Sequence, residues 1–186
     1  MRHVEVVNDL VGQEADVNSR DESGLTPLEG AVIECNVEMI RALAKLGADL
    51  DTRDSNGATP MHTAARGGHV DVIRALVALG AALNIHDDKG KNPLHEAALH
   101  GSVEATRALA AHGADVNATN EHGETPVYAA VVEGHVKVIR VLAELGSNVN
   151  TPDRNGATPV FVCAVKGFAE MIRVLAAYGA DVNSIL

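Results

Sequence analysis

Apolar residues follow a helical period in short segments that recur along the chain at a fixed interval. In the segment 54–85, Val70, Ile73, Leu76 and Val77 stand three and four residues apart, which places them on one face of a helix. The same pattern returns every 33 residues. A fixed period in this range is typical of a stacked repeat architecture, in which each unit buries its apolar face against its neighbours.

Each copy opens with a turn and a short first helix. In the same segment, Asp54 and Gly57 form the turn, because Asp bonds its own backbone and Gly adopts positive φ. Thr59 then caps the helix, and Pro60 takes the first helical position, where its missing N–H is not needed. Helices this short are marginal alone, so neighbouring copies must stabilise them. The periodic glycines, each followed two residues on by Thr-Pro or Asn-Pro, are Gly24, Gly57, Gly90, Gly123 and Gly156.

The recurring residues resemble the ankyrin repeat. The shared pattern is Asp-x-x-Gly-x-Thr-Pro-Leu-His, followed by Ala-Ala, Gly-His and Leu-x-x-Gly-Ala-Asp-Val-Asn. The resemblance implies an all-α solenoid of stacked antiparallel helix pairs, with β-hairpin-like loops that project as fingers. It also implies that finger tips and first helices form the binding surface. The single domain, 1–186, would comprise a partial repeat, 3–18, and five full repeats, 20–52, 53–85, 86–118, 119–151 and 152–184.

The copies depart from the pattern at the position of its His. In the family, this His braces the turn through hydrogen bonds to the backbone. It is present here as His62 and His95, and its place is taken by Glu29, Tyr128 and Phe161 in the other copies. Such irregularity indicates a natural sequence rather than an idealised one.

The two cysteines lie too far apart for an intrachain disulfide. Cys35 and Cys163 occur in the first and last full repeats, and a stacking distance of about 10 Å per repeat separates them by about 40 Å. A disulfide needs Cα atoms within about 7 Å. Cys35 also replaces the Gly that ends the first helix in the other repeats, where a left-handed backbone would cost about 1 kcal/mol.

An acidic residue or Lys recurs three positions before a periodic Arg in the second helices. Residues three apart on a helix are neighbours, so the sequence predicts a ladder of acid–Arg pairs on the outer surface. Each exposed pair would contribute only about 0.3–0.5 kcal/mol. The positions are Glu38 and Arg41, Asp71 and Arg74, Glu104 and Arg107, Lys137 and Arg140, and Glu170 and Arg173.

Charge and hydropathy narrow the classes of partner. The net charge is −10, and no run of Lys or Arg offers the basic face that nucleic acid requires. Acidic residues interrupt the first 18 residues, where a signal peptide needs an apolar core. No apolar run approaches the ~20 residues of a membrane span. We therefore expect a cytoplasmic protein that binds no nucleic acid and does not insert into membranes.

Candidate catalytic and metal-binding motifs fail on spacing. The segment from His95 to His100 resembles a zinc-protease motif, but its two imidazoles are five residues apart rather than four and face different ways. Lys91 follows Gly90 as in a phosphate loop, but Asn92 stands where Ser or Thr should follow. We expect no catalytic residue, no metal and no cofactor.

The residues that recur in every copy form the frame of the repeat. The positions that differ between copies predict a protein-binding surface. Its first-helix stripe mixes apolar and charged residues, although singly exposed apolar residues are also normal on protein surfaces. The predicted partner-binding residues are Arg66, Asp88, Lys89, Lys91, Leu99, His100, Glu121, His122, Glu124, Val132, Glu133, Arg154, Val165 and Lys166.

The last repeat carries three of the four aromatic residues of the chain, which are Phe161, Phe168 and Tyr178. Terminal repeats normally have polar outer faces, so this cluster predicts a possible end-to-end contact with a second copy. Three functions remain open. The chain is a non-enzymatic protein-interaction module, a self-associating structural array, or a regulatory fragment of a larger protein.

Overall fold

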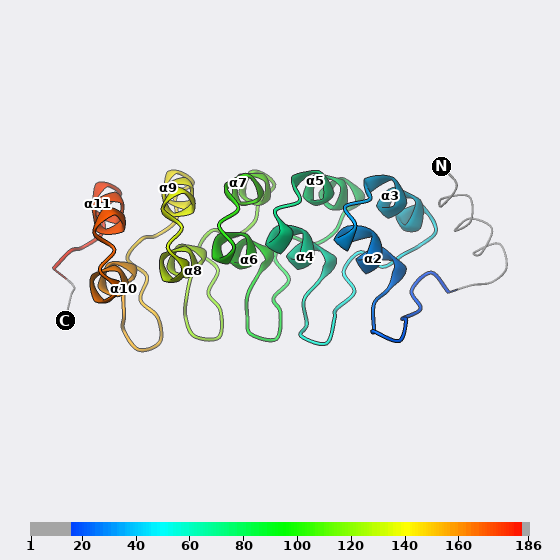
Figure 1. Cartoon of the computed structure of the whole chain (residues 1–186), viewed down its shortest axis with the longest axis horizontal. Coiled ribbons are helices and arrows are strands. Elements are labelled where there is room, and N and C mark those ends of the chain that lie inside the picture. Colours follow the sequence, from blue (N-terminus) through cyan, green and yellow to red (C-terminus); the bar gives the residue numbers. More distant parts are fainter. Residues whose placement is uncertain (1–15, 184–186) are drawn as a thin grey trace.

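The computed structural model describes residues 16–183, which form five helix–turn–helix units stacked side by side in chain order (Figure 1). The first helices of the repeats, called the inner helices below, lie in one row beside the fingers. The second helices lie in another row, called the outer row. The first helices are α2 (Pro27–Ile33), α4 (Pro60–Gly67), α6 (Pro93–Leu99), α8 (Pro126–Glu133) and α10 (Pro159–Lys166). The second helices are α3 (Val37–Lys45), α5 (Val70–Leu79), α7 (Val103–Ala111), α9 (Val136–Glu144) and α11 (Ala169–Ala177). The predicted all-α solenoid is confirmed, while most of the predicted partial repeat, 3–18, lies outside the described residues.

The fingers are joined to one another by backbone hydrogen bonds at their tips. The N–H of Asp88 donates to the carbonyl of Asn56 at 3.0 Å, and the N–H of Glu121 donates to the carbonyl of Lys89 at 2.9 Å. A third such bond joins Arg154 to His122, and single bonds of this kind form no β-strand within residues 16–183. The fingers are therefore chains of turns that touch side by side.

A reciprocal cap starts the first inner helix. The N–H of Glu29 donates to Thr26 Oγ1 at 3.2 Å, and the N–H of Thr26 donates to Glu29 Oε2 at 2.7 Å. This arrangement satisfies two backbone donors that the helix itself leaves without partners. Glu29 thus takes over the capping role that the repeat pattern assigns to His.

The two histidines of the pattern tie each inner helix to the next finger. Nδ1 of His62 accepts the N–H of Thr59 at 3.0 Å, and Nε2 lies 2.9 Å from the carbonyl oxygen of Lys91. His95 repeats the contact, with Nε2 3.0 Å from the carbonyl oxygen of Glu124. These partners assign the ring proton to Nε2, which donates across the junction between repeats.

A residue with a left-handed backbone conformation forms the turn between the two helices of each unit. Gly68, Gly101, Gly134 and Gly167 adopt positive φ there. Cys35 has φ 54° at the same place in the first full repeat, and is the one non-glycine residue with positive φ within residues 16–183. Cys35 is exposed and Cys163 is buried, and both are free thiols. The backbone conformation of the frame therefore persists where the glycine is lost.

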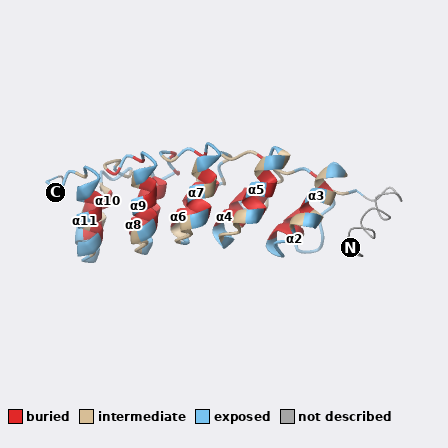
Figure 2. Ribbon diagram, turned by 90° about the horizontal axis from the view of Figure 1, so that it is seen from above, coloured by how far each residue is buried: buried red, intermediate tan, exposed pale blue. Residues whose placement is uncertain are grey.

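The core runs the length of the array, from Leu28 to Leu175, without a break. Figure 2 shows the buried residues on the sides of the helices that face each other, with exposed residues at the helix ends and on the loops. Small side chains such as Ala64 and Ala97 are fully buried between inner helices, which lets the helix axes approach closely.

The predicted acid–Arg ladder is wrong for most of its length, since within residues 16–183 one of its pairs forms. Arg74 Nη1 lies 3.7 Å from Asp71 Oδ1, as the spacing predicts. Arg107, however, reaches across to Glu144 of the next repeat at 3.1 Å instead of bonding within its own helix. A long, exposed Arg side chain can choose between helices, so spacing along one helix does not determine its partner.

Candidate functional site

A cavity of about 360 Å³ lies between the second and third fingers, beside the C-terminal halves of inner helices α4 and α6. Five of the predicted partner-binding residues line it, namely Arg66, Asp88, Lys89, Lys91 and Leu99. The other lining residues are Ser55, Asn56, Ala58, Asp87 and Glu96. The structure therefore gathers residues from two fingers and two helices, up to 44 positions apart in the sequence, around one hollow.

Glu96 forms the back of this cavity. Its side chain is only 4% exposed, and Arg66 Nε donates to Oε2 at 2.9 Å. Lys91 Nζ donates to Oε1 at 3.4 Å, and His100 Nδ1 lies 3.9 Å from Oε2. Burial on its own would raise the pKa of Glu96, but the hydrogen bond from Arg66 and the charges of Arg66, Lys91 and His100 outweigh it, so the pKa lies below its usual value. Glu96 is a buried carboxylate that stays ionised at neutral pH.

The two aspartates of the cavity are also engaged. Asp87 Oδ1 accepts the backbone N–H groups of Lys89 at 2.9 Å and of Lys91 at 2.8 Å, which holds the turn of the finger. Asp88 Oδ1 lies 3.5 Å from Arg53 Nη2, which also donates to the carbonyl of His86 at 2.8 Å. The carboxylates of the cavity therefore already have hydrogen-bond donors within the chain.

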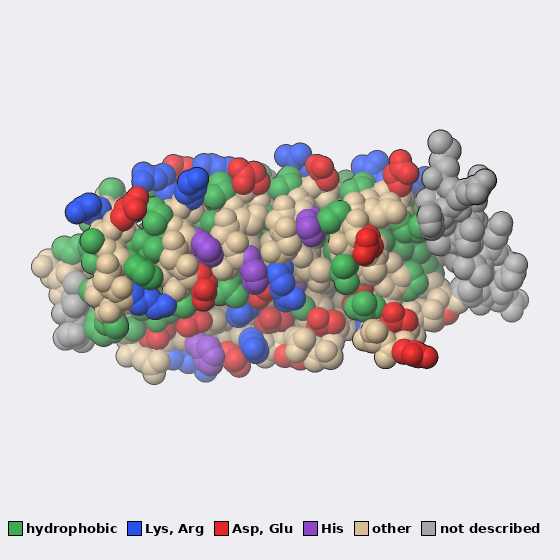
Figure 3. All heavy atoms as spheres, viewed as in Figure 1, with side chains coloured by type: hydrophobic (Ala, Val, Ile, Leu, Met, Phe, Trp, Pro, Cys, Tyr) green, Lys and Arg blue, Asp and Glu red, His purple; other side chains and the backbone are tan. Residues whose placement is uncertain are grey.

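The remaining predicted residues follow the same face into later repeats. Val132 and Glu133 lie at the end of α8, and Val165 at the end of α10 is 71% exposed. Lys166 Nζ donates to the carbonyl of Val132 at 2.6 Å, which links these two helix ends. Beyond the cavity, charged and histidine side chains mix with apolar ones along the middle of one face (Figure 3).

The predicted finger-tip residues of the later repeats lie outside the cavity. His122 Nε2 lies 3.5 Å from Glu121 Oε1. The backbone carbonyl of His122 accepts the N–H of Arg154 at 2.7 Å. Glu124 Oε2 accepts a hydrogen bond from Asn120 at 2.7 Å. These residues lie two and three repeats further along the array than Arg66.

Sequence reasoning missed Glu96 as part of the surface, because it appeared only as a member of the rejected zinc motif. A signal was present, since the aligned residues in the other repeats are Gly30, Thr63, Ala129 and Val162. An acid at a position that is otherwise small or apolar indicates a local partner. His95, its neighbour, points instead to the next finger, and burial lowers its pKa to about 4. Within residues 16–183, no three His, Cys, Asp or Glu side chains are arranged to hold a metal ion.

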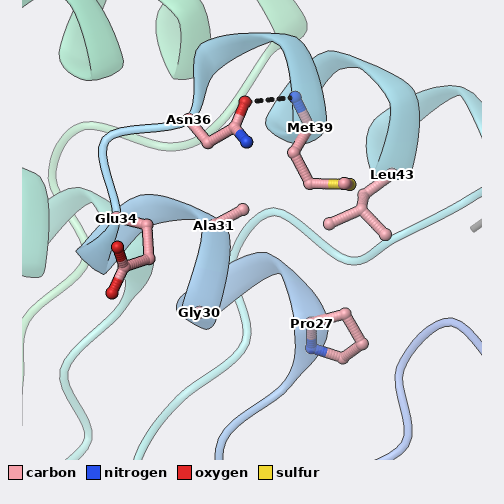
Figure 4. A pocket seen from close by; sticks show the side chains of 7 residues that line it. All are labelled: Pro27, Gly30, Ala31, Glu34, Asn36, Met39 and Leu43. Atoms are coloured by element: carbon pink, nitrogen blue, oxygen red, sulfur yellow. Dashed lines mark hydrogen bonds between the residues drawn. The ribbon is translucent and has the colours of Figure 1, made fainter. Parts of the chain in front are cut away.

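A second pocket, of about 450 Å³, lies at the N-terminal end of the described array (Figure 4). Pro27 and Ala31 of α2 face Met39 and Leu43 of α3 across it. Pro27 is exposed, whereas the equivalent prolines of the four later repeats are buried. No predicted site residue lies in this pocket.

The three aromatic residues predicted for an end-to-end contact are partly engaged within the chain. Phe161 and Phe168 are half-buried, and Tyr178 is 36% exposed. Lys166 Nζ lies 5.8 Å from the centre of the Phe168 ring, and the Tyr178 hydroxyl lies 3.5 Å from Glu144 Oε1. Among the described helices, none has both the length and the apolar character of a membrane span.

Comparison with known proteins agrees with this architecture. A family model described as "Ankyrin repeats (3 copies)" matches four overlapping ranges, 1–87, 46–120, 77–153 and 115–185. The crystal structure of an ankyrin repeat domain from Acinetobacter baumannii is 28% identical, with a TM-score of 0.86 over 97% of this chain and 94% of that one. No curated protein sequence matches the chain. Because the family model matches nearly the whole length and the helices stack in the order it implies, the chain belongs to the ankyrin repeat family, whose members are generally protein–protein interaction modules.

Proposed function

We propose that this chain is a non-enzymatic interaction module that binds a partner protein along its inner helices and finger tips. The observation that carries the proposal is the cavity between the second and third fingers, where five variable positions of the repeat meet. The residues that recur in every repeat explain the stack, whereas these five positions differ from copy to copy. A hollow lined by both charged groups and Leu99 offers the mixture of apolar contact and polar rim that protein interfaces use.

The proposed surface continues from the cavity over Val132 and Val165. Val165 is the most exposed large apolar side chain of the described residues, at 71%. Apolar side chains placed in line on three successive inner helices would lose water together on binding, which contributes about 25 cal/mol per Å². The partner is expected to lie across the third, fourth and fifth repeats as well as in the cavity.

The test is capture of partners from a native extract with the double variant Leu99→Glu and Val132→Glu, and separately with Val165→Glu. Leu145→Glu is the matched control, because Leu145 is 37% exposed at the end of α9 in the other row of helices. Circular dichroism and thermal melts establish that each variant is folded. We expect both inner-face variants to lose a protein that the control retains. Capture of the same proteins by all of them would overturn the proposal.

Self-association is a second candidate, favoured by the exposure of Val165 and the half-buried Phe161 at the last repeat. A second copy stacked there would cover these side chains, and a head-to-tail contact of this kind can propagate. Light scattering across a wide concentration range tests it. A mass that rises with concentration, and that Phe161→Glu returns to the monomer value, is the expected result, whereas a constant monomeric mass would remove this candidate.

A further inference from the structure

We infer that the cavity between the second and third fingers binds a carboxylate of the partner protein, supplied by an aspartate or glutamate side chain. This inference rests on the proposed function and specifies the chemistry of the partner at that site. It follows from the distribution of hydrogen-bond donors and acceptors in the cavity, which is uneven although its charges balance.

The charges around the cavity are three basic and three acidic side chains. The basic ones are Arg66, Lys89 and Lys91, and the acidic ones are Asp87, Asp88 and Glu96. Formal charge alone therefore favours neither an anion nor a cation. What distinguishes the two signs is how much of each group's hydrogen-bonding capacity is already used.

The acidic groups are used within the chain. Glu96 accepts from Arg66 at 2.9 Å and from Lys91 at 3.4 Å and is 4% exposed, so a ligand has little access to it. Asp87 holds two backbone N–H groups of its own finger, and Asp88 lies against Arg53. A basic ligand would have to compete with these contacts at Glu96, at Asp87 Oδ1 and at Asp88 Oδ1.

The basic groups retain free donors. Arg66 bonds Glu96 through Nε alone, so the four N–H groups on its two terminal nitrogens have no partner among the described residues, and its side chain is 47% exposed. Lys91 uses one of its three donors on Glu96, and the Lys89 ammonium group has no partner among the described residues. The planar end of an Arg matches the two oxygens of a carboxylate, and two lysines beside it add further donors.

Glu96 acts as a positioning residue for this donor set. Its carboxylate bonds one edge of Arg66 from behind and also bonds Lys91, which holds two like charges beside each other at the cavity wall. Without this buried negative charge, the two cations would repel each other and the long Arg side chain would sample other rotamers. Holding donors in place before binding reduces the conformational entropy that association costs.

The apolar part of the wall indicates what lies beside the carboxylate. Leu99 lines the cavity next to Glu96 and continues toward Val132 on the following helix. An acidic residue followed by an apolar one would place its carboxylate on Arg66 and its neighbour against Leu99. We therefore choose Ac-Ala-Glu-Leu-Ala-NH2 as the probe, with Ac-Ala-Gln-Leu-Ala-NH2 as its uncharged match.

The experiment is a titration of the isotopically labelled full chain with each peptide, followed through backbone amide chemical shifts. We expect the Glu peptide to shift the amides of Lys89, Lys91 and Leu99 with a Kd in the millimolar range, and the Gln peptide to bind about tenfold more weakly. The shifts should diminish as salt is added, since the attraction is partly screened. Equal binding of both peptides, or shifts confined to other repeats, would overturn the inference.

Two substitutions test which basic groups bind the carboxylate, while Glu96 keeps positively charged neighbours. Arg66→Lys keeps a positive charge but loses the planar fork, and Lys89→Ala removes a side chain that bonds nothing in the described chain. Each should weaken the Glu peptide several-fold and leave the Gln peptide unchanged. Lys45→Ala, on α3 in the outer row, is the matched control and should change neither. If Arg66→Lys and Lys89→Ala both bind as the unaltered chain does, the carboxylate site is wrong.

The variant Glu96→Gln separates an organised site from simple attraction. Removal of a negative charge would strengthen the binding of any anion if only net charge mattered, whereas loss of the group that orients Arg66 and Lys91 should weaken it. We expect the Glu peptide to bind several-fold more weakly to this variant. Tighter binding would overturn the positioning role of Glu96.

The failure of this inference is distinguishable from the failure of the proposed function. A captured partner that Leu99→Glu with Val132→Glu loses, but that Arg66→Lys and Lys89→Ala retain, would leave the interaction surface standing and reject the carboxylate. Loss of that partner both in the Leu99→Glu, Val132→Glu variant and in the Arg66→Lys and Lys89→Ala variants supports the interaction surface and the carboxylate site together. Retention in both sets would reject the surface itself.

Discussion

The third and fifth repeats have the same backbone frame but are tied to their surroundings in different ways. In the third, His95 bonds its own cap at Asn92 and the carbonyl of Glu124 in the next finger, and Glu96 beside it collects two cations. In the fifth, Phe161 takes the place of the His, and it has no polar side-chain atom to bond anything. The comparison teaches that the frame fixes where side chains stand, while the residues two and three positions after Thr-Pro or Asn-Pro decide what each repeat does.

The largest expected difference between these repeats is a pH effect on stability. Burial lowers the pKa of His95 to about 4 in the folded chain, from 6.5 when it is exposed. The unfolded chain therefore binds a proton between these values that the folded chain does not, so stability is complete above pH 6.5 and falls as the pH drops toward 4. The shift corresponds to about 3 kcal/mol over the whole range and about 2 kcal/mol at pH 5.

Urea unfolding at pH 7 and pH 5 measures this effect. The variant His95→Phe, which makes the third repeat resemble the fifth, should lose about 2 kcal/mol less than the original chain on the same change of pH. His62 shifts in the same direction, so the original chain and the variant must be compared at both pH values. An unchanged pH dependence in the variant would contradict a buried, neutral His95.

At pH 7, the same substitution tests the hydrogen bonds themselves. His95→Phe leaves the Asn92 N–H and the Glu124 carbonyl without their side-chain partner, at about 1 kcal/mol for each, or about 2 kcal/mol in total. The reverse change, Phe161→His, faces no following finger within the described residues and should alter stability by less than about 1 kcal/mol. Equal effects of the two changes on the free energy of unfolding would break the comparison.

A matched pair of glycines gives an intermediate effect. Gly101 and Gly167 have φ values of 71° and 74° at the same turn, so an added Cβ is strained in both. At Gly101 that Cβ would also lie 2.7 Å from His135 Nδ1, whereas at Gly167 nothing lies within 4 Å. Gly101→Ala should cost about 2 kcal/mol and Gly167→Ala about 1 kcal/mol in thermal or urea unfolding. A larger loss at Gly167 would show that the third repeat is not the more tightly joined one.

The smallest expected effect concerns exposed apolar residues. Val165→Ser in the fifth repeat should change stability by less than about 0.5 kcal/mol, because the side chain is 71% exposed. Leu99→Ser in the third repeat, where the side chain packs partly on the core, should cost about 1–2 kcal/mol. Paired urea curves decide this, and a cost for Val165 as large as that for Leu99 would mean that Val165 is covered in solution.

The sequence predicts the fold well because its signals are local. Thr59, Pro60 and Gly68 determine a cap, a helix start and a turn through their own backbone preferences, and the repetition of these signals shows the stack. Glu29 illustrates the limit of such reasoning. Its capping role depends on a hydrogen bond to Thr26, which the repeat pattern assigned to His.

The site could be predicted only in part, because it depends on contacts between repeats. The variable positions identify Arg66 and Lys91 as candidates, but not that both bond one buried carboxylate. Glu96 lies 30 residues from Arg66, and only the packing of α6 on α4 brings them together. The failed acid–Arg ladder has the same origin, since Arg107 finds its partner 37 residues away.

The order in which the repeats unfold should also depend on the residue at this position, which changes along the array from His62 and His95 to Tyr128 and Phe161. Each junction between repeats is coupled mainly to its nearest neighbours. At the fourth junction the Tyr128 hydroxyl bonds the Asp153 side chain at 3.1 Å, whereas His62 and His95 bond backbone carbonyls at the two junctions before it. Pulled from its two ends, the chain should release the fifth repeat first and hold its histidine-bonded middle longest, so that the surface around Glu96 outlasts the end of the array that surrounds it.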